Sequence, residues 1–203
     1  MNLQMLSYFI LFSSCLYAAY DCFPLDPPAK QMYVIKNMYK AVGLALLCIL
    51  TLPTVIVPAY HGVWKTSSIH IVAAAYVSHD FVGLLRVPLP FNTKLHHVAS
   101  VMLMLMSFEL DFAVSSLGQA IFVYTVCSAM SFVVNLYLAA RVWSPYPRLR
   151  RTAFVVYLLC CTVNWGWHLT VYQFEWETGH MVYMVALVFI VYDDICLLRW
   201  LIE

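Results

Sequence analysis

The chain has 203 residues, of which 64% are hydrophobic and only 10% are charged, and its formal net charge is +1. Soluble domains carry about 25% charged residues, so this composition excludes an ordinary water-soluble domain. It predicts an all-α, polytopic membrane helix bundle that forms a single transmembrane domain over residues 1–203.

Seven apolar runs predict seven membrane helices. They cover residues 3–20, 41–60, 69–85, 95–110, 113–140, 152–174 and 181–202. A membrane span needs about 20 apolar residues, so the fourth run is short and the fifth is long. Residues 1–40 are then a first helix and an inner loop, and residues 41–203 are a six-helix bundle. Pro53 and Pro58 lie in the second run, where we expect them to kink the helix.

The basic residues predict the orientation of the bundle. With the amino terminus outside, ten of the 11 Lys and Arg residues fall on the inner side. These are Lys30, Lys36, Lys40, Arg86, Lys94, Arg141, Arg148, Arg150, Arg151 and Arg199. Only Lys65 falls outside, which is the asymmetry expected of inner loops. The carboxyl terminus then lies on the cytosolic side, or on the matrix side of a mitochondrial membrane.

The first run could instead be a cleaved signal peptide, because it is short and ends in the small residues Ala18 and Ala19. It has no basic region before its apolar stretch, as a signal peptide would have. Cleavage would also place the basic loops outside, against the charge rule. We therefore expect an uncleaved helix.

Three polar residues near the inner ends of separate runs predict a shared polar layer. Asp80, Asn135 and Asp193 each precede an arginine by six residues, which corresponds to about 9 Å along a helix. Their common depth suggests a site, because polar groups in lipid are costly. The seven cysteines include no CxxC pair and no metal-ligand spacing, so we expect them to pack as small apolar residues.

Histidines add chemistry to this layer. The short turn after the third run brings the His79–Asp80 stretch close to His96 and His97. Adjacent residues on a helix point about 100° apart, so both histidines of the pair cannot face one atom. A carboxylate from Asp80 or Asp193 could hold one imidazole as a general base.

A purely structural role remains the alternative for these groups, through interhelical hydrogen bonds or contact with lipid head groups. For His79 or Asp194 alone, the structural role is favoured. For Asp80, His96, His97 and Asp193 together, a functional site is favoured, because several ionisable groups share one membrane layer.

The stretch HHVASVMLMLMS, which begins at His96, resembles the histidine-pair motif of TLC-domain proteins, the membrane family that includes the ceramide synthases. The family pattern is HHxxTxxLxxxS, so Ser100 stands in the place of a threonine. YVSHDFVGLL (76–85) is similar to the aspartate-bearing helix of non-synthase members. SFVVN (131–135) is similar to their fifth helix. The resemblance covers about residues 76–199 and implies a TLC-like bundle.

The chain departs from ceramide synthases after the histidine pair. Asp111 and Val114 stand where those enzymes have asparagine and arginine, and residues 124–135 lack their histidine and aspartate cluster. Ser128 stands where non-synthase members often have glutamate. An acyl-CoA-dependent sphingoid base acyltransferase is therefore not expected.

The leading expectation is a protein that binds a lipid or acyl chain between its helices and influences membrane lipid composition or metabolism. The residues expected to bind the lipid are His96, His97, Asp80, Asn135 and Asp193. The expected partners are membrane lipids, with other membrane protein subunits as a further option and no nucleic acid. No metal or other cofactor is expected. The expected membrane is the endoplasmic reticulum or another endomembrane, with the mitochondrial inner membrane as the alternative.

Two alternatives to this function stay open. One is a non-catalytic accessory subunit of a larger membrane complex. The other is an acyltransferase for a lipid amine or hydroxyl, in which His96, His97 and Asp80 are catalytic. An ion or proton pathway would need polar groups across the whole membrane, and the chain has them mostly on one side.

Overall fold

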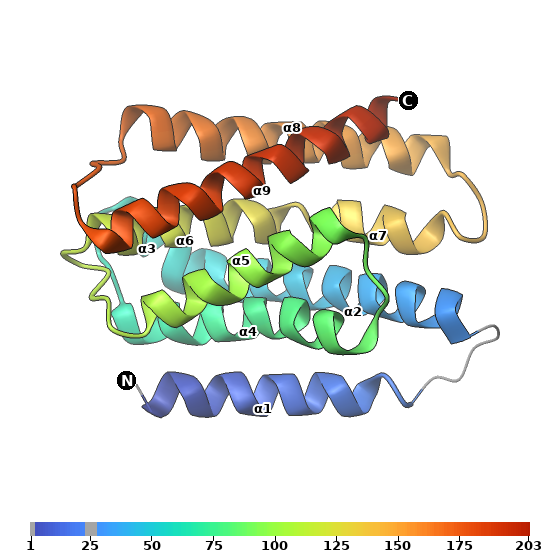
Figure 1. Cartoon of the computed structure of the whole chain (residues 1–203), viewed down its shortest axis with the longest axis horizontal. Coiled ribbons are helices and arrows are strands. Elements are labelled where there is room, and N and C mark those ends of the chain that lie inside the picture. The colour runs from blue at the N-terminus through green and yellow to red at the C-terminus, as the bar shows by residue number, and fades with distance from the viewer. Residues whose placement is uncertain (1–2, 23–27) are drawn as a thin grey trace.

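The computed structural model describes residues 3–22 and 28–203, and every regular element in these ranges is a helix (Figure 1). The elements are α1 (Leu3–Ala19), α2 (Pro28–Thr51), the π-helix η1 (Leu52–Ile56), α3 (Val57–Tyr60), α4 (Thr66–Arg86), α5 (Phe91–Ser107), α6 (Ser116–Met130), α7 (Phe132–Ala140), α8 (Pro147–Thr170) and α9 (Thr178–Ile202). Helix α2 continues through η1 into α3, and only Ser131 separates α6 from α7. The all-α prediction is confirmed.

Five helical segments are long and apolar enough to cross a membrane. They are Gln31–Tyr60, Thr66–Arg86, Ser116–Ala140, Pro147–Thr170 and Thr178–Ile202. Helices α1 and α5 have 17 residues each and are shorter than a typical span. Each of the seven predicted apolar runs therefore contains helix, and five of these helices have the length and composition of a span.

Residues 1–40 were predicted to form a first helix and an inner loop, but residues 28–40 are helical, because α2 begins at Pro28. Proline suits the first helical position, where its missing N–H has no intrahelical partner. Lys36 and Lys40 are therefore helical, and both are buried in the bundle. Hydropathy placed the start of this helix at Ala41, where the apolar run begins, because the helical residues before it include polar side chains.

Pro53 produces one wide turn rather than a break. The proline lies at the start of η1, and the helix continues through Val57 to Tyr60. Proline lacks an N–H and its ring crowds the carbonyl four residues earlier, which a π-turn relieves. The Thr51 hydroxyl also donates to the Leu47 carbonyl, at 2.6 Å.

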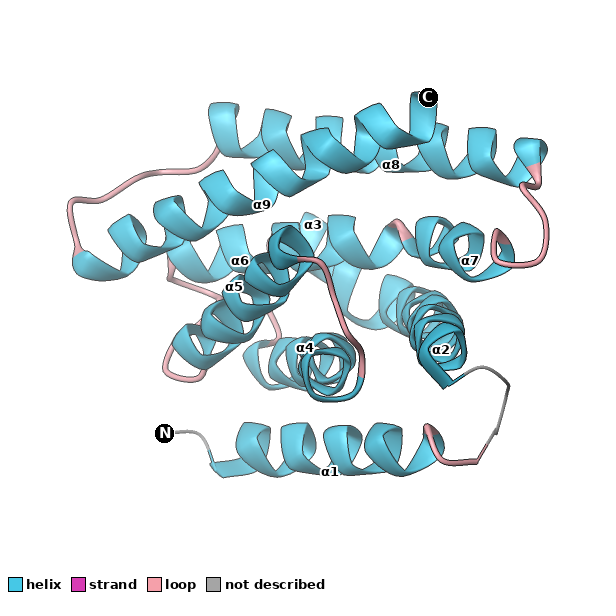
Figure 2. Ribbon diagram, turned by 45° about the vertical axis from the view of Figure 1, so that its right-hand side comes forward, coloured by secondary structure: helices cyan, strands magenta, loops and turns pink. Residues whose placement is uncertain are grey.

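Helix α4 lies inside the bundle, with α1 against one side and α2 and α5 as further neighbours. Helices α8 and α9 lie together on the side opposite α1, and α5 lies between α4 and α9 (Figures 1 and 2). The core between α5, α6 and α9 contains Leu103, Ile121 and Tyr183. Many large apolar side chains point outward, among them Ile49 and Val155, as expected where helices face lipid.

The link between α4 and α5 determines where the histidine pair lies. It comprises only Val87–Pro90, and Pro90 precedes the first residue of α5. This short link places the second turn of α5, with His96 and His97, beside the last turns of α4. Asp80 of α4 is completely buried there.

Candidate ligand-binding site

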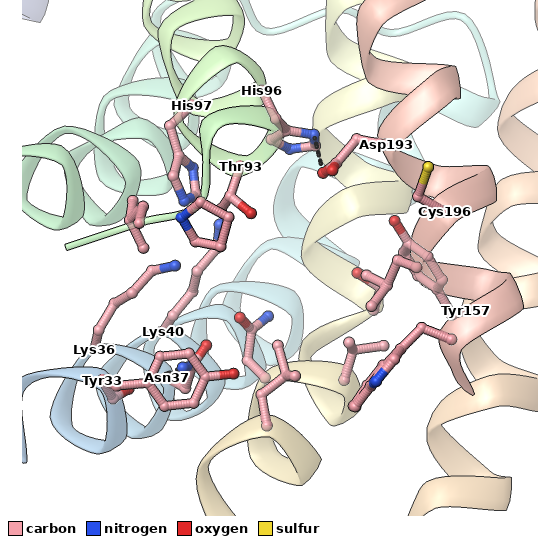
Figure 3. A pocket seen from close by; sticks show the side chains of 18 of the residues that line it. Tyr33, Lys36, Asn37, Lys40, Thr93, His96, His97, Tyr157, Asp193 and Cys196 are labelled. Atoms are coloured by element: carbon pink, nitrogen blue, oxygen red, sulfur yellow. Dashed lines mark hydrogen bonds and ion pairs between the residues drawn. The ribbon is translucent and has the colours of Figure 1, made fainter. Parts of the chain in front are cut away.

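A cavity of about 370 Å³ lies among α2, α5, α7 and α9 (Figure 3). Its polar lining consists of Tyr33, Lys36, Asn37, Lys40, Thr93, His96, His97, Ser128, Ser131, Asn135, Arg141, Tyr157 and Asp193. Leu89, Leu138 and Trp200 are among its apolar lining residues. Ligand pockets usually have volumes of about 300–1,000 Å³ and combine an apolar wall with a few convergent polar groups. The cavity is therefore large enough for the polar part of a small ligand.

His97 and Lys40 meet on one buried carboxylate. The Nδ1 atom of His97 lies 2.8 Å from Asp80 Oδ1, and Lys40 Nζ forms an ion pair with the same oxygen. The His97 contact has the distance of an ion pair but not the angles of a well-aligned hydrogen bond. A buried carboxylate is tolerated only when charge and polar groups compensate it. Lys40 supplies the compensating charge and His97 supplies a second polar neighbour.

The second ring nitrogen of His97 has no such partner. Nε2 is buried and makes no hydrogen bond with any residue in the described ranges. The ring nevertheless lines the cavity (Figure 3). With Nδ1 directed at Asp80, Nε2 is the nitrogen left for a ligand. An Nδ1–H tautomer would give it a lone pair that can accept a proton or a hydrogen bond.

His96 contacts a different carboxylate and ties α5 to α9. Its Nδ1 lies 3.3 Å from Asp193 Oδ2, as the dashed line in Figure 3 marks. Its Nε2 lies 3.4 Å from the Tyr124 hydroxyl, which is 3.1 Å from Ser100 Oγ. The two histidine rings are nearly perpendicular, at 88°. Each histidine of the pair therefore has its own acidic neighbour.

Four of the five residues predicted to bind lipid line the cavity: His96, His97, Asn135 and Asp193. The fifth, Asp80, lies behind His97 and does not belong to the cavity wall. The structure thus brings all five together, and their role toward a lipid stays a prediction.

Asp194 and His79 point elsewhere. Asp194 accepts a 2.6 Å hydrogen bond from the Tyr157 hydroxyl and so joins α9 to α8. His79 lines a separate groove between α1 and α2 and packs against Gly43. These contacts are interhelical packing, the role favoured for each residue alone.

The sequence interpretation missed the contribution of α2. Tyr33, Lys36, Asn37 and Lys40 all line the cavity, and the two lysines are only 6% and 7% exposed. Their spacing was the available signal, because residues four apart lie on one face of a helix. The sequence predicts a loop for these residues, because the polar face of a helix lowers its mean hydropathy below that of an apolar run.

Arg141 stands at the edge of this cavity and joins three helices. Its guanidinium donates to the Tyr33 hydroxyl at 3.0 Å and lies 4.4 Å from the Trp200 ring centroid. Cation–π contacts of this kind hold a guanidinium in place while leaving other N–H groups available. Arg141 thus links α7 to α2 and α9 beside the cavity.

Comparisons with protein families, with curated proteins and with solved structures gave no significant match to this chain. The resemblance to TLC-domain proteins therefore rests on the sequence motifs alone, and the function is inferred from the site.

Proposed function

We propose that this chain is a TLC-like integral membrane protein with seven transmembrane helices that binds a lipid between them. In this proposal α1 and α5 complete the set of seven with the five longer helices, and the amino terminus lies outside. The cavity then faces the inner leaflet of an endomembrane such as the endoplasmic reticulum, or of the mitochondrial inner membrane. By binding lipid, the protein influences membrane lipid composition or metabolism.

The observation that carries this proposal is the unpartnered Nε2 of His97 in the cavity wall. Asp80 and Lys40 make a network that orients the ring, and networks of this kind are costly inside a membrane. A polar cluster that only joined helices would satisfy its members with one another. A ligand head group in contact with Nε2 would use the hydrogen-bonding capacity that this nitrogen has left.

An apolar groove next to the cavity supports a lipid as the ligand. The groove lies between α5 and α9 and has a volume of about 430 Å³. Only apolar atoms of its lining residues are exposed in it. Leu95, beside His96, belongs to it, as does Phe189, one helical turn before Asp193. A lipid whose head occupies the cavity could lay an acyl chain along this groove.

Lipid retention by His97→Ala tests the proposal. The variant is purified in mild detergent beside His61→Ala, which changes an exposed histidine at the opposite end of the bundle. Lipid is extracted and quantified per mole of protein. We expect the wild type and His61→Ala to retain equal amounts and His97→Ala to retain several-fold less, because a contact to a buried polar group is worth about 1–3 kcal/mol. Equal retention by all three proteins would remove His97 from the site.

The Asp80–His97 pair also favours a second candidate, an acyltransferase for a lipid amine or hydroxyl. A carboxylate that holds Nδ1 leaves Nε2 as the atom that can accept a proton from an attacking hydroxyl or amine. His96 would then orient a substrate from the α9 side of the cavity. A new acylated lipid whose amount depends on His97 would support this candidate.

A further inference from the structure

The cavity carries an excess of positive charge on its α2 and α7 sides. Lys40 is paired with Asp80, and Asp193 has His96 as its neighbour. Lys36 forms no hydrogen bond or ion pair with any residue of the described segments, although it is only 6% exposed. Arg141 has a hydroxyl and aromatic rings as its partners but no carboxylate within the same segments. Among the described residues, these two cations at the cavity therefore have no carboxylate in direct contact.

The position of Lys36 is built into the packing of α2 on α4. Its aliphatic stem passes over Gly83, where an added Cβ would lie 3.3 Å from Lys36 Cε. The glycine leaves room for the stem, and the ammonium group extends into the space below His97 (Figure 3). A buried ammonium group is costly without a counter-charge. An anion that enters this space would supply such a counter-charge.

Other polar groups around Lys36 suit an anionic head group that also carries hydroxyls. The Thr93 hydroxyl lines the same space and can donate. The Asn37 amide donates to the Tyr33 carbonyl at 2.8 Å, which leaves its buried Oδ1 without a hydrogen-bond partner in the described part of the chain. Arginine and lysine together are the usual partners of phosphate oxygens. A free amide oxygen can accept from a head-group hydroxyl.

We propose that the cavity selects lipids whose phosphate head group carries a net negative charge, with Lys36 as the main phosphate contact and Arg141 as the second. This inference rests on the proposed function, in which a lipid head occupies the cavity. It goes further by assigning the chemical class of the head group and the residues that select it. A zwitterionic head group carries its own cation beside the phosphate, and Lys36 and Arg141 would repel that cation.

Competition between two lipids with identical acyl chains tests the proposal. The purified protein is incubated in detergent with equimolar phosphatidylglycerol and phosphatidylcholine, and bound lipid is counted by native mass spectrometry. We expect the wild type to prefer phosphatidylglycerol by about tenfold, as a charge-assisted contact predicts. Lys36→Met, which keeps an apolar stem, should reduce this preference to about twofold or less. Lys65→Met, at an exposed position in an outer loop, should retain it in full.

Arg141→Gln gives a second variant that does not depend on a buried position, since Arg141 is exposed. It should weaken the preference about threefold while its helical circular dichroism matches that of the wild type. The same spectrum shows whether Lys36→Met has folded. Retention of the full preference by both folded variants would overturn the proposal.

Further arms separate this inference from the function on which it rests. Lipid bound without preference by the wild type would overturn the head-group assignment and leave lipid binding intact, whereas no bound lipid would overturn the proposed function. Inorganic phosphate that displaces phosphatidylglycerol as effectively as free lipid does would show a phosphate-ion site instead. If oleate outcompetes phosphatidylglycerol, the head group of the ligand would be a carboxylate and not a phosphate, which would overturn the phosphate assignment.

Discussion

Lys40, Asp80 and His97 form a buried chain of contacts from α2 through α4 to α5. Asp80 is completely inaccessible to solvent, so its charge depends on these two partners. The same contacts fix the direction of the His97 ring and therefore the position of Nε2. At the scale of single residues, the stability of the bundle and the geometry of the cavity therefore both depend on the carboxylate of Asp80.

Asp80→Asn should be strongly destabilising, because it leaves Lys40 buried without an anion. Removal of one partner from a buried ion pair typically costs about 3–5 kcal/mol. Thermal unfolding in detergent, followed by circular dichroism, measures the change. Glu177→Gln is the control, because Glu177 is exposed and outside the cavity. A melting temperature for Asp80→Asn no lower than that of the control would contradict the structural role of this carboxylate.

Asp111 makes a pH-sensitive contact at the end of the bundle where α4 begins. The Thr66 hydroxyl donates to its Oδ1 at 2.7 Å and the Ala113 backbone N–H at 3.0 Å, and together they hold the pKa of Asp111 below its usual value. A carboxyl whose folded pKa is depressed adds stability above its unfolded pKa of about 3.9 and loses it as pH falls through the folded pKa. Below about pH 4, wild-type stability should approach that of Asp111→Asn. Melting temperatures of both proteins between about pH 6 and pH 2 measure this, and a constant difference would contradict it.

At the scale of elements, hydropathy predicts where helices occur better than where they begin. The runs that became α4, α8 and α9 extend three to five residues beyond their predicted starts. The largest error is α2, where a polar face toward the cavity lowered the hydropathy of helical residues. The π-turn at Pro53 could not be predicted in detail, because a proline can equally kink or end a helix.

The candidate site was predictable in part: the depth of its residues follows from the sequence, but their pairing does not. A repeated spacing placed Asp80, Asn135 and Asp193 at one depth, and the short α4–α5 link placed the histidines beside them. Which carboxylate faces which histidine depends on helix rotation and on the order of neighbouring helices. The pairing of Lys40 with Asp80 requires α2 to pack on α4, which no local pattern in the sequence specifies.

The contact of α2 with α4 gives a prediction at this scale. A Cβ on Gly43 of α2 would clash with the His79 ring of α4, whereas a Cβ on Gly166 of α8 would meet no described atom within 4 Å beyond its chain neighbours and the nearby backbone of its own helix. Gly43→Ala should therefore destabilise the protein by about 1–3 kcal/mol, as overpacking does. Gly166→Ala should be neutral or stabilising by up to about 1 kcal/mol, because alanine favours helix. Thermal unfolding of both variants distinguishes them, and equal effects would contradict this packing.

At the scale of the whole molecule, the cationic residues gather at one end of the bundle. The links after α4 and α7 lie together at one end, and the links before α4 and before α9 lie at the other (Figure 1). Arg86 pairs with Asp21 at the first end, and Lys65 is exposed at the second. This asymmetry is the physical basis for the proposed orientation.

Maleimide labelling of intact microsomes tests that orientation, because the accessible face of a microsome is cytosolic. Cys22 is exposed at the end where the cationic residues gather, so in the proposed orientation a membrane-impermeant maleimide should label it without permeabilisation. Lys65→Cys in a Cys22→Ser background should be labelled only after permeabilisation. The reverse pattern would invert the bundle and place the cavity at the opposite leaflet.

A native mass spectrum of the wild-type chain, extracted from its own membrane in mild detergent, tests the central claim most directly. The account predicts a species at 23.3 kDa plus the mass of one lipid, and a diminished lipid peak for His97→Ala. A lipid-free chain, or recovery only within a much larger complex whose stability does not depend on His97, would contradict lipid binding and favour an accessory subunit.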